Sequence, residues 1–242
     1  MLCGVNKMTN KEKQILRVPA TPEEIKRNYA KISKLYAALE GRFEKGLRKR
    51  GLQLLAVQKG EQVLEIGFGT GYSLVEIARS VGETGKSYGI DLTPEMLELA
   101  RERLRKAVLL NRVELHQGDA RDMPYEANMF DAAYMAETLE LFDTPDIPIV
   151  LQEIKRVLKP MGRLGVVSLS KEGRENSRFL RLYEWVHQKI PKYASCRPIY
   201  VEQSIEEAGY EIVKREEFLL WRLAPMKIVL AKPVQAASIS QS

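Results

Sequence analysis

The residues best suited to chemistry form a glycine-rich turn, Gly67-x-Gly69-x-Gly71, which directly follows a short apolar run. Such a turn between a strand and a helix lets a ligand approach the backbone closely, and the N-terminus of the helix attracts an anionic group. The dinucleotide fingerprint is Gly-x-Gly-x-x-Gly, whereas here the third glycine comes one residue early. Glu65 also stands two residues before the first glycine. The pattern therefore favours a ligand other than a dinucleotide.

Two further acids, Asp91 and Asp119, each follow a short apolar run. Open α/β sheets bind ligands outside the carboxyl ends of their strands, and a carboxylate can accept two hydroxyl groups together. Each acid also has a simpler interpretation. Asp91 can be a turn residue or helix N-cap before Thr93, Asp119 can close an Asx-turn, and Glu65 can form a salt bridge at the end of a sheet.

The elements that must position these acids alternate along the chain from residue 62 onward. Strand-like runs are predicted at 63–66, 87–91, 113–116, 130–135 and 163–170, with helical patterns at 72–80, 93–104 and 145–158. This alternation predicts an α/β fold with a parallel sheet and helices on both of its faces.

The flanks of this region add further predicted elements. Before it, one helix starts at Thr21-Pro22 and a second covers about 41–51; after it come helices at 175–190 and 201–208 and strands at 211–220 and 226–231. The helix start at Thr21 rests on an N-cap residue followed by proline and acids in the first turn. These flanks are the segments that would cover the sheet.

The composition excludes several classes of protein. The chain has 242 residues, of which 45% are hydrophobic and 29% charged, as in ordinary soluble globular proteins. Its two cysteines are far apart, which argues against a disulfide framework or a cysteine-rich zinc module. No run of 18 apolar residues and no secretory signal is visible. We therefore expect a cytoplasmic protein without a metal site.

The net charge of +6 is concentrated in residues 1–60, where basic residues greatly outnumber acids. A basic segment can meet nucleic acid or an anionic membrane surface. The other interpretation is a solvated helical face with no partner.

The segment Glu65–Gly71 resembles the first motif of the class I S-adenosylmethionine-dependent methyltransferases. Further motifs follow in the family's order at Asp91, Gly118-Asp119, Phe130-Asp131 and Lys159-Pro160-x-Gly162. The resemblance implies a doubly wound, seven-stranded, mostly parallel Rossmann-like sheet with an N-terminal helical cap. It also implies that the last two strands add an antiparallel strand at one edge. We divide the chain into a tail and cap (1–51), a cofactor-binding domain (52–234) and a disordered tail (235–242).

The same resemblance implies S-adenosylmethionine as cofactor and S-adenosylhomocysteine as product. Asp91 would accept hydrogen bonds from both ribose hydroxyls, and Asp119 would accept one from the adenine amine. Glu65 would contact the amino acid portion of the cofactor. The residues implied to bind the cofactor are Glu65, Gly67, Phe68, Gly69, Gly71, Asp91, Leu92, Met96, Asp119, Ala120, Ala136 and Glu137.

The acceptor is implied by a closer resemblance, to the C-methyltransferases of ubiquinone and menaquinone biosynthesis. The matching segments are 67–71, 139–145 and 156–163. That family often has Tyr-Asp near the N-terminus, whereas Tyr29 and Tyr36 are followed here by alanine. The resemblance implies C-methylation of a prenylated quinone ring. Other O-, N- or C-methylation of a small molecule, a nicotinamide oxidoreductase and a non-catalytic cofactor-binding protein stay open as alternatives.

No nucleic acid partner is expected, because the sequence lacks the Asn/Asp-Pro-Pro-Tyr/Phe motif after the fourth strand and the Pro-Cys pair of the cytosine enzymes. The basic segment 42–50 and the helix 175–190 could instead make peripheral contact with a membrane that holds a lipid-like acceptor. Both could equally form a lid or cap packed on the sheet. The sequence predicts no oligomeric state.

His187 is the candidate general base, since histidine titrates near neutral pH, although a surface or capping role is the alternative. The candidate substrate or lid residues are Tyr29, Tyr36, Tyr183, Arg197 and Tyr200, for which ordinary lid packing is the alternative. Trp185 and Trp221 are expected in the core rather than at the acceptor.

Overall fold

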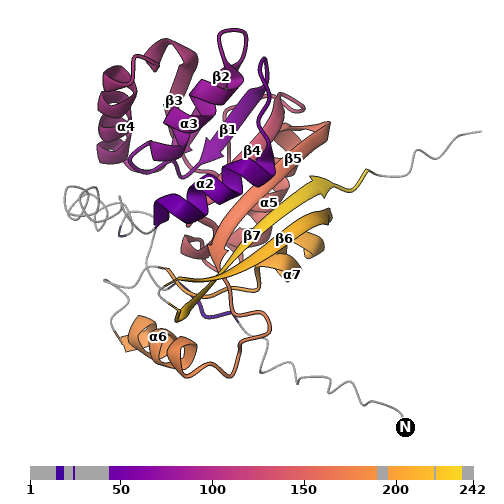
Figure 1. The fold of residues 1–242 in the computed structure, drawn as a ribbon. Helices are drawn as coiled ribbons and strands as arrows, with labels where there is room; N and C mark the ends of the chain where they lie inside the picture. Colours follow the sequence, from indigo (N-terminus) through magenta and orange to yellow (C-terminus); the bar gives the residue numbers. More distant parts are fainter. Residues whose placement is uncertain (1–14, 19–23, 25–43, 190–195, 221, 236–242) are drawn as a thin grey trace, which may run out of the picture.

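A single seven-stranded sheet runs through the chain in the order β3-β2-β1-β4-β5-β7-β6 (Figure 1). The computed structural model describes residues 15–18, 24, 44–189, 196–220 and 222–235. The strands are β1 (Gln62–Ile66), β2 (Lys86–Asp91), β3 (Val113–Gln117), β4 (Phe130–Ala136), β5 (Leu158–Leu169), β6 (Tyr210–Leu220) and β7 (Ala224–Pro233). The first five are mutually parallel, so the predicted doubly wound, mostly parallel sheet is confirmed.

Helices connect and cover these strands. They are α2 (Glu44–Leu55), α3 (Tyr72–Val81), α4 (Pro94–Lys106), α5 (Asp146–Val157), α6 (Arg178–Lys189) and α7 (Val201–Glu207), with short 3-10 turns η1 (Leu110–Arg112) and η2 (Leu139–Leu141). Within the part of the chain that the structure describes, no helix is both long and apolar enough to cross a membrane.

The antiparallel strand of the sheet is β7, and it lies between β5 and β6 rather than outermost. Burial explains the order. The first eight residues of β7 are all buried, whereas β6 alternates between covered and exposed residues. A strand that is apolar on both faces belongs inside a sheet, and a half-polar strand can form its edge. The expectation that the last two strands add an antiparallel strand at one edge of the sheet is therefore confirmed, with β6 as the outermost strand.

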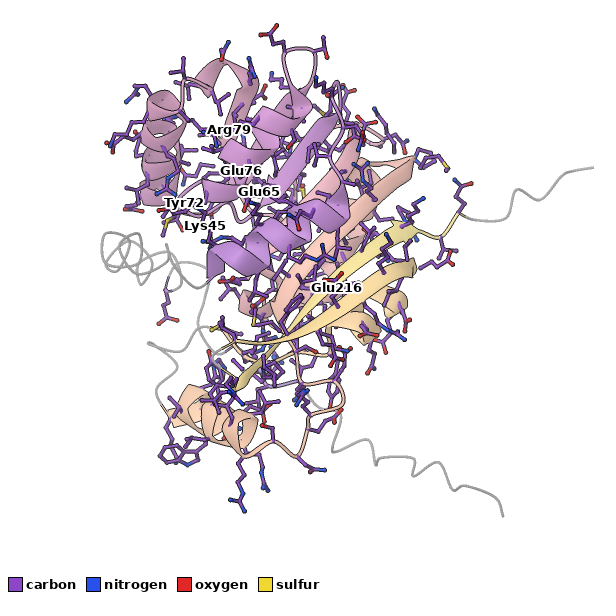
Figure 2. All side chains as sticks on the ribbon, in the orientation of Figure 1. Lys45, Glu65, Tyr72, Glu76, Arg79 and Glu216 are labelled. Atoms are coloured by element: carbon purple, nitrogen blue, oxygen red, sulfur yellow. The ribbon has the colours of Figure 1, made fainter. Side chains whose placement is uncertain are left out.

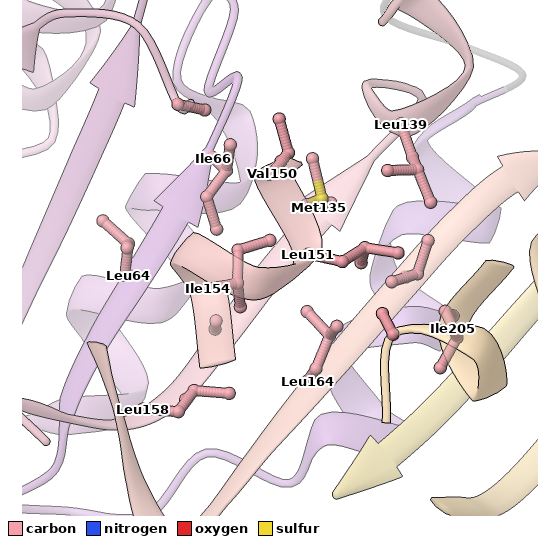
Figure 3. Packing of buried hydrophobic residues seen from close by; sticks show 14 of the residues in the cluster. Leu64, Ile66, Met135, Leu139, Val150, Leu151, Ile154, Leu158, Leu164 and Ile205 are labelled. Carbon is pink, nitrogen blue, oxygen red and sulfur yellow. The ribbon is translucent and has the colours of Figure 1, made fainter. Parts of the chain in front are cut away.

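Alternate residues of the central strands face two separate cores. Val63, Ala132 and Tyr134 pack with α2 and α3, whereas Leu64 and Met135 face the opposite side. On that side, α5 contributes Val150, Leu151 and Ile154 and α7 contributes Ile205, all labelled in Figure 3. This alternation follows from the two-residue period of a strand, and it gives the sheet a helical layer on each face.

Helix α2 lies directly against the sheet, and it continues without a break across position 51, where the cap was expected to end. Gly51 allows the close approach, because a Cβ atom there would lie 2.6 Å from the hydroxyl of Tyr134. That hydroxyl donates a hydrogen bond of 2.9 Å to the carbonyl of Arg48. The helix therefore packs on the sheet, and it brings Arg48 to the cavity at the carboxyl ends of the strands.

Candidate functional site

A cavity with a volume of about 170 Å³ opens where β1, β2, β3 and β4 end. Every predicted cofactor residue except Gly71 lines it. The lining residues not predicted from the sequence are Arg48, Ile66, Tyr72, Ser73, Ile90, Thr93, Gly118, Arg121, Thr138, Leu141, Phe142, Asp143 and Asp146. The fold thus gathers motifs from four separate strands at a single site, as expected for an open α/β sheet.

The turn after β1 depends on its glycines. Gly67, Gly69 and Gly71 all have positive φ angles, of 66°, 49° and 82°. At Gly67 a Cβ atom would also lie 2.5 Å from the hydroxyl oxygen of Thr138. Since only glycine adopts such angles without strain, the backbone of this turn stays open to a ligand. Gly71 itself faces away from the cavity and allows α3 to pack on Ala100 of α4.

Asp91, at the end of β2, holds this turn against the neighbouring strand. Its two carboxylate oxygens accept hydrogen bonds of 2.9 Å from the backbone N–H groups of Gly69 and Thr93. Burial raises the pKa of Asp91, and these two N–H groups counteract part of the rise. Each carboxylate oxygen has two lone pairs, so both can accept a further hydroxyl from a ligand. Asp91 can therefore hold the turn in place and bind a ligand at the same time.

Asp119, after β3, lines the cavity but is already engaged. It accepts hydrogen bonds from the backbone N–H of Arg121, at 2.9 Å, and from its guanidinium, at 2.6 Å. The first of these is the Asx-turn considered for this position. Partial burial acts to raise the pKa of Asp119, but the bonds from Arg121 outweigh it and the net effect is a lowered pKa. Arg121 also pairs with Asp146 at 3.0 Å, which fixes this wall of the cavity.

The end of β4 brings a further acid to the cavity, Glu137, in a strained conformation. Its φ angle of 56° lies in the left-handed region, which a residue with a Cβ seldom adopts. Its backbone N–H donates to the carbonyl of Val167 at 2.7 Å, and the neighbouring Thr138 hydroxyl donates to the carbonyl of Ala136 at 3.0 Å. Strain of this kind is concentrated at ligand sites, where surrounding bonds maintain it.

Arg48 and Tyr72 are site residues that the sequence did not reveal. Arg48 belongs to the basic segment 42–50, yet it is buried and lines the cavity. Its guanidinium lies 5.6 Å from the ring centre of Tyr72, and that of Arg103 lies 3.2 Å from the same centre. Figure 2 shows Tyr72 and Glu65 close to the N-terminal half of α2. In a helix, position 48 lies on the same face as Leu55. This spacing was the sequence signal that could have indicated the burial of Arg48.

The rest of that basic segment is only partly free to meet a partner. Arg50 pairs with Glu216 on β6 at 2.5 Å, whereas Lys45 and Lys49 are exposed. The segment 42–50 is therefore partly built into the domain and is not a continuous basic surface over its described residues.

The predicted lid residues that the structure describes, Tyr183, Arg197 and Tyr200, are not in the lining of the cavity. Arg197 is fully buried and donates to the carbonyls of Leu16, at 2.5 Å, and Glu140, at 2.7 Å. Tyr200 is buried, and the hydroxyl of Tyr183 lies 2.7 Å from the sulfur of Cys196. Tyr29 and Tyr36 lie outside the described residues. We call the meeting point of segments 15–18, 139–144 and 196–200 the lid junction.

The lid junction also holds the N-terminal segment against the cavity wall. Arg17 forms a bidentate ion pair with Asp143, which lines the cavity, and Asp143 accepts a further bond from the Val18 N–H at 2.9 Å. His187, on α6, is buried, with its Nε2 atom 3.3 Å from the carbonyl of Arg17. It does not line the cavity, so its role as a general base stays a prediction.

Glu140 is a buried carboxylate at the same junction. Burial raises its pKa to about 7, although the hydroxyl of Ser168, the N–H of Leu169 and the charge of Arg197 all favour the ionised form. The hydroxyl and the N–H donate at 2.7 and 3.2 Å. Burial likewise lowers the pKa of Arg197 to about 10. Near neutral pH, burial therefore changes how far Glu140 is ionised, whereas Arg197 stays protonated.

Trp185 departs from the expectation that it would be a core residue. Its side chain is 56% exposed on α6. Trp221 lies outside the described residues.

The chemistry of the cavity lining fits S-adenosylmethionine. The glycine turn supplies backbone groups, carboxylates that can accept hydrogen bonds stand at the ends of β2, β3 and β4, and Phe68 and Met96 supply apolar surface. Within the described residues, no cluster of three or more His, Cys, Asp or Glu side chains could hold a metal ion.

Comparison with known proteins agrees with this geometry. Residues 63–162 match the family model described as a methyltransferase domain. The chain is 30% identical over 223 residues to a demethylmenaquinone methyltransferase of Staphylococcus aureus (strain JH9), covering 82% of this chain and 90% of that protein.

Solved structures show the same fold. A SAM-dependent methyltransferase from Aquifex aeolicus is 26% identical, with a TM-score of 0.58 over 76% of this chain and 89% of that one. A geranyl diphosphate C-methyltransferase from Streptomyces coelicolor A3(2) is 16% identical, with a TM-score of 0.65 over 80% of this chain and 81% of that one. The second likeness concerns the fold alone.

A glycine turn, a row of carboxylates at strand ends and a relative that matches over most of both chains lead to the same conclusion, and the chain belongs to the class I S-adenosylmethionine-dependent methyltransferases.

Proposed function

We propose that this methyltransferase acts on a ring carbon of a prenylated quinol, in the cytoplasm at a membrane surface. The observation that carries the proposal is the 30% identity to a demethylmenaquinone methyltransferase over 90% of that protein. A match of this extent includes the segments that would shape an acceptor pocket, not only the cofactor motifs.

The wall of the cavity after β4 supports an apolar acceptor. Leu141 and Phe142 follow Glu137 and Thr138 along the chain and line the cavity. They belong to the part of the lid junction that also lines the cavity. An aromatic ring with a hydrocarbon tail would pack well against such a wall, because burying apolar surface is its main source of binding energy.

The cofactor supplies a methyl group activated by a positively charged sulfur. The residues of this chain have to bind and orient the two ligands and exclude water. Asp91 would accept the ribose hydroxyls, and the backbone of the Gly67–Gly71 turn would receive the amino acid end. Arg48 stands at the same end of the cavity, where its positive charge would attract the carboxylate of that amino acid. Asp119 would accept the adenine amine with the lone pairs that Arg121 leaves available.

The acceptor also needs a group that takes up a proton. A ring carbon becomes more nucleophilic when its hydroxyl ionises, and methylation releases a ring proton. Glu137 is our candidate for this task, because its carboxylate belongs to the cavity lining beside Leu141 and Phe142. His187 is the alternative, and acting there would require it to move away from the carbonyl of Arg17.

The proposal is tested with the purified chain, methyl-labelled S-adenosylmethionine and a short-chain prenylated naphthoquinol kept reduced. We expect label in the organic phase. Asp91→Asn should lower transfer strongly, whereas Asp122→Asn, at an exposed acid outside the cavity, should not. Glu137→Gln should lower kcat more than it weakens S-adenosylhomocysteine binding, and His187→Gln should leave kcat near the wild-type value.

Two results would overturn parts of this proposal. Label that enters only water-soluble products from a cell extract would remove the quinol acceptor and retain the methyltransferase. Loss of kcat in His187→Gln, with Glu137→Gln unaffected, would assign the proton to the histidine.

A further inference from the structure

The outward face of helix α6 is apolar and basic at once. Leu182 and Trp185 are 61% and 56% exposed. The other exposed side chains of the helix are Arg178, Arg181, Gln188 and Lys189. Spacings of three and four residues place all six on one side of the helix. Large exposed apolar side chains grouped in this way mark an interaction surface rather than random exposure.

The inward face of α6 fixes this orientation. Leu180 and His187 are both 1% exposed, and Phe179 and Tyr183 pack on the core cluster that includes Ala224 and Met226. The helix has one acid, Glu184, and it pairs with the buried Lys171 at 2.9 Å. The outward face therefore carries three cations and no carboxylate from its own helix.

The turn between β6 and β7 extends this surface. It lies next to α6 in Figure 1, and Ala224, the residue of β7 that follows it, belongs to the same core cluster as Phe179. Leu223 is 56% exposed and Arg222 is also exposed. The turn thus repeats the combination of a large apolar and a basic side chain.

The surface lies close to the acceptor side of the cavity. His187, on the inner face of α6, lies 3.3 Å from the carbonyl of Arg17, and Arg17 pairs with Asp143 in the cavity lining. One short segment of chain therefore connects the helix to the cavity wall. The outer face is thus separated from this wall of the cavity by the helix itself and by the segment that contains Arg17.

We propose that the outward face of α6, defined by Arg178, Arg181, Leu182, Trp185 and Lys189, docks onto the surface of an anionic phospholipid bilayer. Tryptophan is favoured at the boundary of a bilayer, and basic side chains are attracted to anionic headgroups. A second copy of the chain fits less well, because a twofold contact would bring like charges together. The benefit of docking, delivery of a lipid-like acceptor, rests on the proposed function.

The test is co-sedimentation of the full chain with vesicles of phosphatidylcholine alone or with phosphatidylglycerol added. We expect binding only to the anionic vesicles. Leu182→Ser combined with Trp185→Ser should lower it at least about tenfold. Arg178→Gln combined with Arg181→Gln should lower it roughly 20- to 30-fold, at about fivefold for each lost cation. Matched controls on α4 and just after it, at the far end of the molecule in Figure 1, are Val108→Ser and the pair Arg105→Gln and Lys106→Gln.

Each outcome decides the proposal. A blue shift of Trp185 fluorescence in a Trp221→Phe background, seen only with anionic vesicles, supports it. Equal vesicle binding by the α6 variants and the α4 controls overturns it, as does a dimer in sedimentation analysis that the Leu182 and Trp185 changes abolish.

The same variants separate this proposal from the proposed function. All should bind S-adenosylhomocysteine and methylate a detergent-dissolved short-chain quinol normally, while methylation of a vesicle-embedded acceptor falls in the α6 variants alone. If the dissolved quinol is never methylated, the acceptor assignment fails, yet vesicle binding still decides the docking surface.

Discussion

At the cofactor side of the cavity the ligand-facing groups come from turns that directly follow β1, β2, β3 and β4, whereas the lid junction is assembled from three distant segments. Asp91 and Gly69 are 22 positions apart, but Arg197 and Leu16 are 181 apart. At the cofactor side, a glycine turn supplies backbone groups to the cavity. The lid junction, in contrast, is held together largely by buried charged side chains. The comparison teaches that one region depends on local geometry and the other on long-range packing.

Arg197→Ala should have the largest effect, and on stability rather than on cofactor binding. Removing a fully buried guanidinium leaves the carbonyls of Leu16 and Glu140 without their donor and opens a cavity. We expect the free energy of unfolding to fall by about 3–5 kcal/mol. Urea denaturation measures it, with Arg79→Ala at an exposed pair as the control. A small loss would mean that the lid junction is not structural.

Asp91→Ala should show the opposite pattern, with an effect mainly on binding. Its loss removes the predicted contacts to both ribose hydroxyls, and S-adenosylhomocysteine affinity should fall by about 2–4 kcal/mol. Calorimetric titration measures this affinity. Binding of 5′-methylthioadenosine, which keeps the ribose, should weaken by the same amount. Unchanged affinity in Asp91→Ala, next to an unchanged Asp122→Ala control, would remove the ribose assignment.

Glu140 should make the stability of the lid junction depend on pH. Its pKa is about 7 in the folded chain against an ordinary 4.5, so the folded state holds the proton more tightly. Its contribution to stability is complete below pH 4.5 and is lost as the pH rises through 7, by up to about 3 kcal/mol. Glu140→Gln should lack this loss. Parallel unfolding curves for wild type and variant between pH 4.5 and 8 would contradict the assignment.

Arg48→Met sharpens the boundary between the two regions, because Arg48 comes from α2 yet lines the cofactor side. S-adenosylhomocysteine affinity should fall by about 1–2 kcal/mol if its charge meets the amino acid carboxylate. Binding of 5′-methylthioadenosine, which has no carboxylate, should not change. Lys49→Met, at the exposed neighbouring position, is the matched control. Equal losses for both ligands would point to a packing role instead.

Much of the cofactor side could be predicted because its signals are local. A glycine that needs a positive φ, an acid that ends an apolar run and a proline that opens a helix each depend on a few neighbouring residues. The strands and helices after residue 62 therefore agree closely with expectation, and Asp91 and Asp119 meet at one cavity although 28 positions of sequence separate them.

The sequence by itself determined the alternation of strands and helices, the glycine turn and the identity of the cofactor family, since these follow from periodicity and short motifs. Only the tertiary structure decided that Arg48 and Arg197 are buried, that His187 faces the carbonyl of Arg17 and that Trp185 is exposed. The physical reason is that a side chain's environment depends on which distant segment packs against it. Local spacing specifies the face of a helix, but it does not specify what covers that face.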